Sequence, residues 1–98
     1  VTASTNIIEQ AAEWGADALL VHHGIFWGKG VQSVDRILGK RLRPLLENDI
    51  NLCAYHLPLD AHPSIGNNAQ IASRFGLYDV MMTDICTVGN FSEPLPFS

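Results

Sequence analysis

The chain has 98 residues, of which 47% are hydrophobic and 16% charged, and its formal net charge is −4. This composition excludes a disordered chain, and the length allows one domain at most. The basic residues gather only at Lys40, Arg41 and Arg43. We therefore expect no nucleic-acid partner bound through its phosphates.

No apolar segment has the length of a membrane span, so we expect no membrane partner and a cytoplasmic protein. Cys53 lies in an apolar run, which predicts a buried structural thiol rather than a disulfide with Cys86. The sequence opens on Val1 and Thr2, which have the character of a strand already under way. We expect residues 1–98 to be a fragment of a larger α/β metal-binding protein that carries the N-terminal half of its site.

The first predicted unit is a helix followed by a strand. Residues 1–3 are interpreted as a strand end, and Ser4, Thr5 and Asn6 offer side chains for a helix N-cap. Hydrophobic residues then recur at helical spacing over residues 7–14. Gly15 is placed to end this helix in a left-handed conformation, and residues 18–21 form an apolar strand.

A loop rich in glycine follows this strand and carries two large aromatic residues, Phe26 and Trp27. Exposed aromatic rings beside a polar site can form the wall of a pocket. Aromatic residues also prefer burial, so packing on the sheet edge is an equal alternative. The sequence leaves both interpretations open.

The next predicted pair is a helix and a strand at residues 50–55. Leucines at helical spacing predict a helix that opens at Asp35 or at Gly39. Pro44 favours a start near Lys40, or a break, because proline costs little only in the first turn of a helix. Asn48 and the residue after it end the helix.

Proline also shapes the segment that follows. Pro58 and Pro63 are expected to exclude a helix across residues 56–62. A helix over residues 69–75 is predicted with Asn67 as N-cap, Gln70 as its return partner and Gly76 as its end. An anion site at this helix start is the alternative to ordinary capping.

One or two strands are predicted over residues 80–88, and residues 89–98 are expected to be extended. The alternation of strands and helices predicts an α/β fold. We expect a three-layer arrangement in which helices flank a mostly parallel sheet.

Polar residues follow two predicted strands at the point where each strand ends. His22 and His23 come directly after residues 18–21, and His56 follows residues 50–55, with Asp60 and His62 shortly after it. Ligands of open α/β sheets collect beyond the carboxyl ends of the strands. If the two strands are neighbours, these imidazoles and one carboxylate meet at one spot.

This set of side chains predicts a metal site. Consecutive strand residues point to opposite faces, so His22 and His23 fit two ions better than one. Imidazole and carboxylate ligands suit zinc, iron, manganese or nickel, and a metal-bound water can act as a nucleophile near neutral pH. His56 is a ligand, a proton donor or an orienting residue. His62 is the weakest member, because capping the loop before Pro63 explains it equally well.

The segments ALLVHHG (residues 18–24), NLCAYHLPLDAHP (51–63) and GNN (66–68) closely resemble the Nif-three-like family, whose bacterial members are labelled GTP cyclohydrolase I type 2 homologues. The resemblance implies a two-domain α/β protein with two divalent metal ions and a homohexameric ring. It implies that His22, His23 and Asp60 are metal ligands, and that His56 serves acid–base catalysis or contacts a substrate. Family members add a histidine and a glutamate from near their C-terminus, and this chain has neither.

Two functions follow from these observations. The first is a dinuclear metal-dependent hydrolase of the GTP cyclohydrolase I type 2 homologue group, in which water activated by metal attacks a nucleotide or a cyclic amide. The alternative is a non-catalytic, metal-binding regulatory or interaction protein, because fold similarity does not establish a reaction. The 98 residues alone are expected to be inactive.

Overall fold

The computed structural model describes residues 1–83 and 86–96, which form two compact units, Val1–His56 and Leu57–Ser98. Among the described residues, every buried hydrophobic side chain except that of Ala72 belongs to the first unit. The single core expected from the length therefore lies in the first unit.

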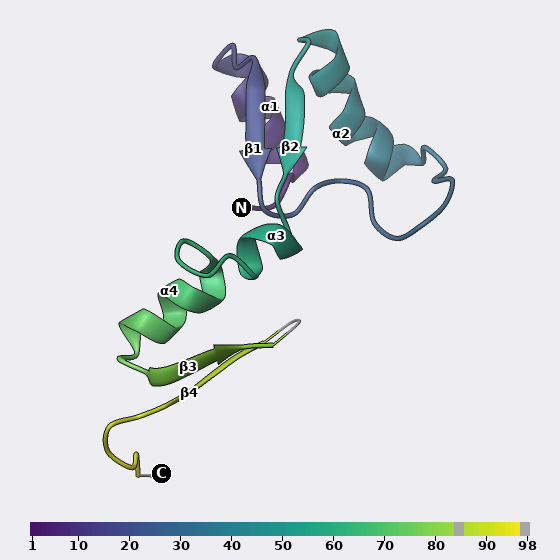
Figure 1. Cartoon of the computed structure of the whole chain (residues 1–98). Helices are drawn as coiled ribbons and strands as arrows, with labels where there is room; N and C mark the ends of the chain where they lie inside the picture. The colour runs from purple at the N-terminus through teal and green to yellow at the C-terminus, as the bar shows by residue number, and fades with distance from the viewer. Residues whose placement is uncertain (84–85, 97–98) are drawn as a thin grey trace. The chain divides into compact units, whose positions relative to one another are not determined.

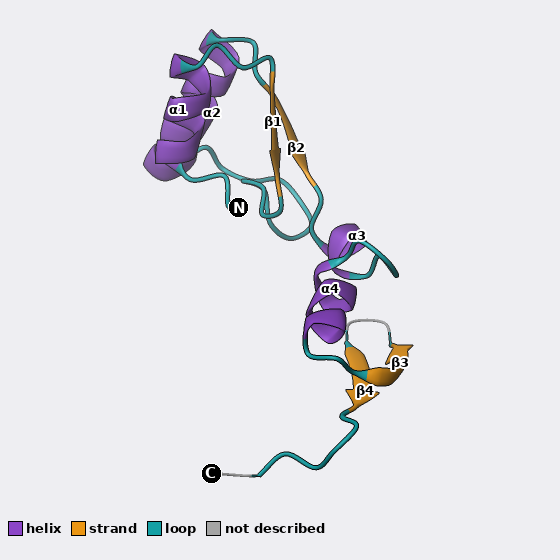
Figure 2. Cartoon of the chain, turned by 90° about the vertical axis from the view of Figure 1, so that its left-hand side faces the viewer, coloured by secondary structure: helices purple, strands orange, loops and turns teal. Residues whose placement is uncertain are grey.

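The first unit is built on two parallel strands, β1 (Ala18–Val21) and β2 (Asn51–Ala54). Helices α1 (Thr5–Glu13) and α2 (Arg36–Glu47) lie together over one face of this pair (Figures 1 and 2). Helix α2 makes the crossover that a parallel pair requires. The predicted α/β class, with parallel strands and packed helices, is confirmed.

The two faces of this sheet differ in burial. Leu19 and Leu52 are paired in the register and pack against the core, in which Ile8 is fully buried. Leu20 and Cys53 are the next pair, and both are exposed. The prediction of a buried Cys53 thiol is wrong, because successive strand side chains alternate and the helices of this unit cover one face.

Helix α1 begins and ends as its sequence predicts. Ser4 is the N-cap residue, and its hydroxyl oxygen accepts a hydrogen bond from the Ile7 N–H at 3.3 Å. Asn6, another predicted candidate, accepts instead from the side chain of Gln10 within the helix. Gly15 follows the helix at φ +72°, the left-handed conformation that glycine adopts at little cost.

Helix α2 begins earlier than predicted and runs through Pro44 without a break. The Asp35 carboxylate caps it by accepting from the Leu38 N–H at 2.7 Å. Leu38 and Leu45, on either side of the proline, are both buried in the core. Tertiary packing therefore outweighs the hydrogen bond that Pro44 cannot donate.

The second unit begins with a short helix that the sequence analysis excluded, α3 (Leu57–Asp60). Pro58 is its second residue, where a missing N–H has no helical partner to lose. Helix α4 (Asn67–Arg74) follows, and its N-cap is Gly66 without a side-chain cap. The predicted capping by Asn67 and Gln70 is wrong, because the side-chain amide of Gln70 donates to the Ser64 carbonyl oxygen at 2.7 Å.

Strands β3 (Tyr78–Met82) and β4 (Thr87–Asn90) complete the second unit as an antiparallel pair with an irregular register between Tyr78 and Met81. The sequence predicted one or two strands here within a mostly parallel sheet. The connection between the two strands is too short for the crossover of a parallel pair. None of the helices in the described part of the chain has the length and apolar character that a membrane span requires.

Candidate metal centre

The end of β1 is fixed by the first residues of the chain. The N–H groups of His22 and His23 both donate to the Val1 carbonyl oxygen, at 3.0 and 3.1 Å. The Ala3 N–H donates to the His23 carbonyl oxygen at 2.8 Å, and Thr2 forms a parallel bridge with His23. Residues 1–3 therefore act as the predicted strand end and hold the backbone of both histidines.

His56 is brought to the same edge by β2. The register pairs Val21 with Ala54, and the Tyr55 N–H donates to the Val21 carbonyl oxygen at 3.0 Å. His56 therefore directly follows Tyr55, whose N–H makes the last hydrogen bond to β1. His22 directly follows the end of β1 in the same way. The predicted meeting of these two strand ends is confirmed within the first unit.

The three imidazole rings contact one another. The ring centroids of His22 and His23 lie 4.5 Å apart, those of His22 and His56 4.9 Å, and those of His23 and His56 5.0 Å. One ring nitrogen from each residue lies within 4.8 Å of the other two. Strand β1 ends at Val21, so the alternation of side chains across a strand does not force His22 and His23 apart.

The donor set fits a transition metal. Nitrogen ligands bind zinc at about 2.0–2.1 Å, so two nitrogens on one ion lie at most about 4.2 Å apart. A set whose members lie within 4.8 Å of one another can close on one ion with small side-chain movements. The same spread also suits two ions about 3.5–4 Å apart, the spacing of two-metal hydrolytic sites.

Thr2 is a site residue that the sequence analysis missed. Its hydroxyl oxygen lies 3.0 Å from Nδ1 of His23. A hydrogen bond at one nitrogen of an imidazole restrains the ring orientation and leaves the other nitrogen to bind a metal. The two residues are separated by 21 positions, and the fold alone brings them together.

Asp60 is half-buried on α3, in the second unit, whereas the histidine cluster is built by the first unit alone. Its Oδ1 accepts a hydrogen bond from the Asn67 side-chain amide at 2.8 Å. The Asn67 side chain thus orients the carboxylate instead of capping α4. A metal-binding carboxylate is commonly held in this way by a second polar group.

His62 also belongs to the second unit and caps its own loop. Its Nδ1 accepts hydrogen bonds from the backbone N–H groups of Ser64 at 3.3 Å and Ile65 at 3.2 Å. Pro63 lies between His62 and Ser64 in the chain and has no N–H to donate. This contact is the loop-capping role that the sequence offered as the alternative to metal binding.

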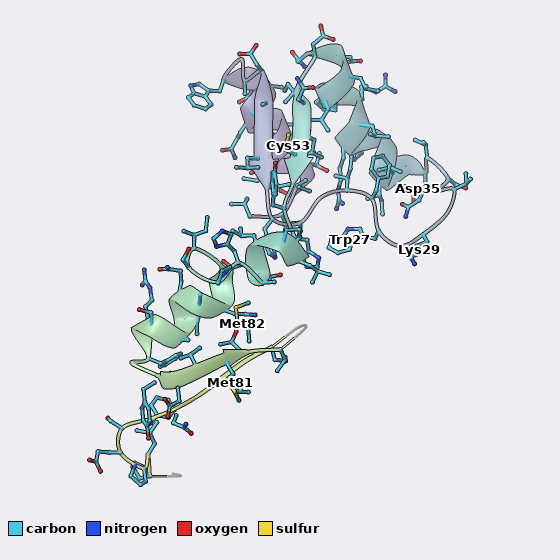
Figure 3. The ribbon with its side chains drawn as sticks, in the orientation of Figure 1. Trp27, Lys29, Asp35, Cys53, Met81 and Met82 are labelled. Carbon is cyan, nitrogen blue, oxygen red and sulfur yellow. The ribbon has the colours of Figure 1, made fainter. Side chains whose placement is uncertain are left out.

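Trp27 borders the histidine cluster. Its ring centroid lies 5.7 Å from that of His23 and 5.4 Å from that of His56. Its side chain is 53% exposed, and it lies on the loop that leads from β1 to α2 (Figure 3). The structure therefore places this ring beside the polar site rather than in the hydrophobic core.

Comparison with known proteins agrees with this architecture. The family profile of Duf34/NIF3 (NGG1p interacting factor 3) matches residues 1–98. The chain belongs to the DUF34/NIF3 family. A family relative from Vibrio cholerae, named GTP cyclohydrolase 1 type 2 homolog, is 48% identical over 100 residues, which cover 97% of this chain and 40% of the relative. The chain thus spans about 40% of the length of this curated relative.

Two solved structures of NIF3 proteins share the fold. TTHA1606 from Thermus thermophilus is 45% identical with a TM-score of 0.72, and the match covers 87% of this chain and 35% of that one. Protein ybgI, described as of unknown function, is 51% identical with a TM-score of 0.73, covering 83% of this chain and 32% of its own. The resemblance read from the two histidine motifs is confirmed.

Proposed function

We propose that the full-length protein is a metal-dependent hydrolase with a dinuclear centre. His22, His23 and Asp60 would hold the ions, and further ligands would come from residues beyond this chain. The observation that carries the proposal is the convergence of three imidazoles at two strand ends, with ligand atoms within 4.8 Å. The proposal includes the three-layer sheet expected from the alternation of strands and helices, and the cytoplasmic location expected from the sequence. It also includes the hexameric ring that the family resemblance implies.

Each residue has a distinct part in this proposal. His22 and His23 would bind metal, and the Thr2 hydroxyl at 3.0 Å would keep the His23 ring in its ligating orientation. Asp60, oriented by Asn67, would add the negative charge that balances a divalent ion. The metals would supply a nucleophile from water near neutral pH.

His56 would move a proton or contact the substrate. Its ring lies 4.9 and 5.0 Å, between centroids, from those of the two proposed histidine ligands. An imidazole at this distance can reach a group bound at the metals and exchange a proton with it. Because it is also close enough to ligate, its role must be measured separately from metal content.

The proposed substrate is a nucleotide or a cyclic amide. The name of the Vibrio cholerae relative, GTP cyclohydrolase 1 type 2 homolog, motivates this class. Zinc, iron, manganese and nickel all accept imidazole nitrogen together with carboxylate oxygen. The donor set therefore favours these four metals over calcium and magnesium.

A non-catalytic, metal-binding regulatory or interaction protein is the second candidate. The family description names an interacting factor, which is the observation that favours it. The two candidates differ in turnover. A metal-loaded hydrolase converts a substrate in a panel of nucleotides and cyclic amides, whereas a regulator binds its partner without conversion.

The test is the metal content of the full-length protein by element-resolved X-ray fluorescence, for the native sequence and for His22→Ala and Asp60→Ala. We expect both variants to lose bound metal. His62→Asn is the matched control, since it changes the one histidine outside the cluster and keeps a polar group at the loop. Metal content unchanged in both His22→Ala and Asp60→Ala would remove the proposal. His56→Gln is expected to retain metal and lose turnover.

A further inference from the structure

Trp27 exposes half of a large apolar ring immediately beside a polar cluster. The ring meets that of His56 edge to face at an interplanar angle of 80° and that of His23 at 46°. It nevertheless remains 53% exposed, and it is not part of the hydrophobic core. Unlike Trp14, which is also exposed, Trp27 contacts the histidine cluster, so a ligand bound at that cluster can cover its exposed surface.

The loop holds Trp27 in place from both sides. Ile25, two residues earlier, is 7% exposed and belongs to the core. The side-chain amide of Gln32 donates a hydrogen bond to the Trp27 carbonyl oxygen. Gly28 turns the chain directly after the tryptophan at φ +80°. An anchored tryptophan has only two side-chain torsions to fix, so it can offer a contact surface at a low entropic cost.

We infer that Trp27 stacks against a planar heteroaromatic ring of the ligand that binds at the histidine cluster, and so selects ligands that carry such a ring. This inference rests on the proposed function and narrows its substrate class from nucleotides and cyclic amides to ring systems with a π face. An indole surface has no charge to pair with a phosphate, whereas every nucleobase has a face that can stack on it. The sugar and phosphate groups would then add little at this position.

Trp14 provides a matched control within the same unit. It is the C-cap residue of α1 and is 87% exposed. It precedes β1, whereas the histidines follow that strand, so the two tryptophans lie at opposite ends of β1. A ligand at the histidine cluster should therefore change the fluorescence of Trp27 and leave that of Trp14 unchanged.

The test is a fluorescence titration of the metal-loaded full-length protein with guanosine and with uridine, and with ribose 5-phosphate as the ring-free probe. Both nucleosides are expected to give a saturable change in the native protein and in Trp14→Phe. The change should be absent in Trp27→Phe at matched nucleoside absorbance. Ribose 5-phosphate is expected to give none.

Affinity and metal content are measured on the same samples. Trp27→Ala is expected to bind the responding nucleoside about 5- to 160-fold more weakly, the loss typical of one base-stacking contact. Its metal content should equal that of the native protein. If Trp27→Ala loses metal together with ligand, the ring only packs the histidines, and the inference is overturned.

The inference and the proposed function fail in different ways. A native protein that takes up no metal contradicts the proposed function before any nucleoside is added. A native protein that binds metal, but whose Trp27 fluorescence responds to neither nucleoside or responds equally to ribose 5-phosphate, overturns the stacking inference alone.

Discussion

In the first unit, the site histidines follow two strands that a buried core holds in register, whereas in the second unit Asp60 ends a four-residue helix with no buried side chain. The first unit fixes its site through backbone ladders and apolar packing. The second unit relies on local polar contacts, among them the bond from Asn67 to Asp60 and the loop cap by His62. The two units therefore hold their proposed metal ligands by different means, the first through a buried core and the second through polar side-chain contacts.

The largest effect on stability is expected from a cavity in the core of the first unit. Ile8→Ala removes the side chain that is fully buried there and should lower the free energy of unfolding by about 2–5 kcal/mol. Ile37→Ala is the control, because Ile37 is 64% exposed and its truncation should cost less than about 0.5 kcal/mol. Chemical denaturation of the full-length protein measures both. Equal losses would show that the core does not hold this unit.

The next largest effect on stability is expected from a substitution at Gly66, in the second unit. A Cβ at Gly66 would collide with the carbonyl oxygens of Leu59 and His62, so Gly66→Ala should destabilise the protein by about 1–3 kcal/mol. The control is Gly39→Ala, where the nearest atom to a Cβ is Val34 Cγ1 at 3.8 Å. Alanine should stabilise this helical position by up to about 1 kcal/mol. Shifts of the same sign in the two melting temperatures would contradict this prediction.

The hydrogen bonds that orient the proposed ligands His23 and Asp60 are expected to affect metal affinity in both units. Thr2→Val in the first unit and Asn67→Leu in the second each remove the partner of a proposed ligand. Loss of such a partner typically weakens metal binding by about 10- to 100-fold. Calorimetric titration with zinc measures the loss.

Thr2→Ser keeps the hydroxyl and should restore most of the affinity. A Thr2→Val protein with native affinity would mean that the His23 ring is held by its backbone bonds alone. If Asn67→Leu loses more than Thr2→Val, the second unit depends more on its polar contacts, as the comparison predicts.

The smallest expected effect concerns Pro44 inside α2. Pro44→Ala restores the N–H that the helix lacks at this point, and it also frees the unfolded chain. The gain should exceed the loss and raise the free energy of unfolding by about 1 kcal/mol. Thermal unfolding followed by circular dichroism measures it. A lower melting temperature would show that proline suits this position of the helix better than alanine does.

Local patterns predicted much of the first unit and the meeting of its histidines. Gly15 marked the end of α1, and the apolar runs before His22 and His56 marked two neighbouring strands. Each of these signals depends on a few adjacent residues. The resemblance to a family then connected the histidine motif with the segment that carries Asp60.

The sequence-based predictions were wrong or incomplete mainly where contacts between residues far apart in the chain outweigh local sequence preferences. Pro44 argued for a broken helix, but buried leucines on both sides hold α2 together. Cys53 was placed in a core because the sequence does not show which strand face a helix covers. Thr2 gave no sign of its role, since it bonds to a residue 21 positions away that only the fold brings near. Asn67 was interpreted as a helix cap, but its side chain donates to Asp60 instead.

The most direct test of the central claim is X-ray absorption spectroscopy at the metal edge of the zinc-loaded full-length protein. We predict a first coordination shell that includes imidazole nitrogens at about 2.0–2.1 Å, with fewer of them in His22→Ala. His62→Asn should give the native spectrum. A shell of oxygen atoms alone, or one that His22→Ala leaves unchanged, would contradict a metal centre built on the two strand ends.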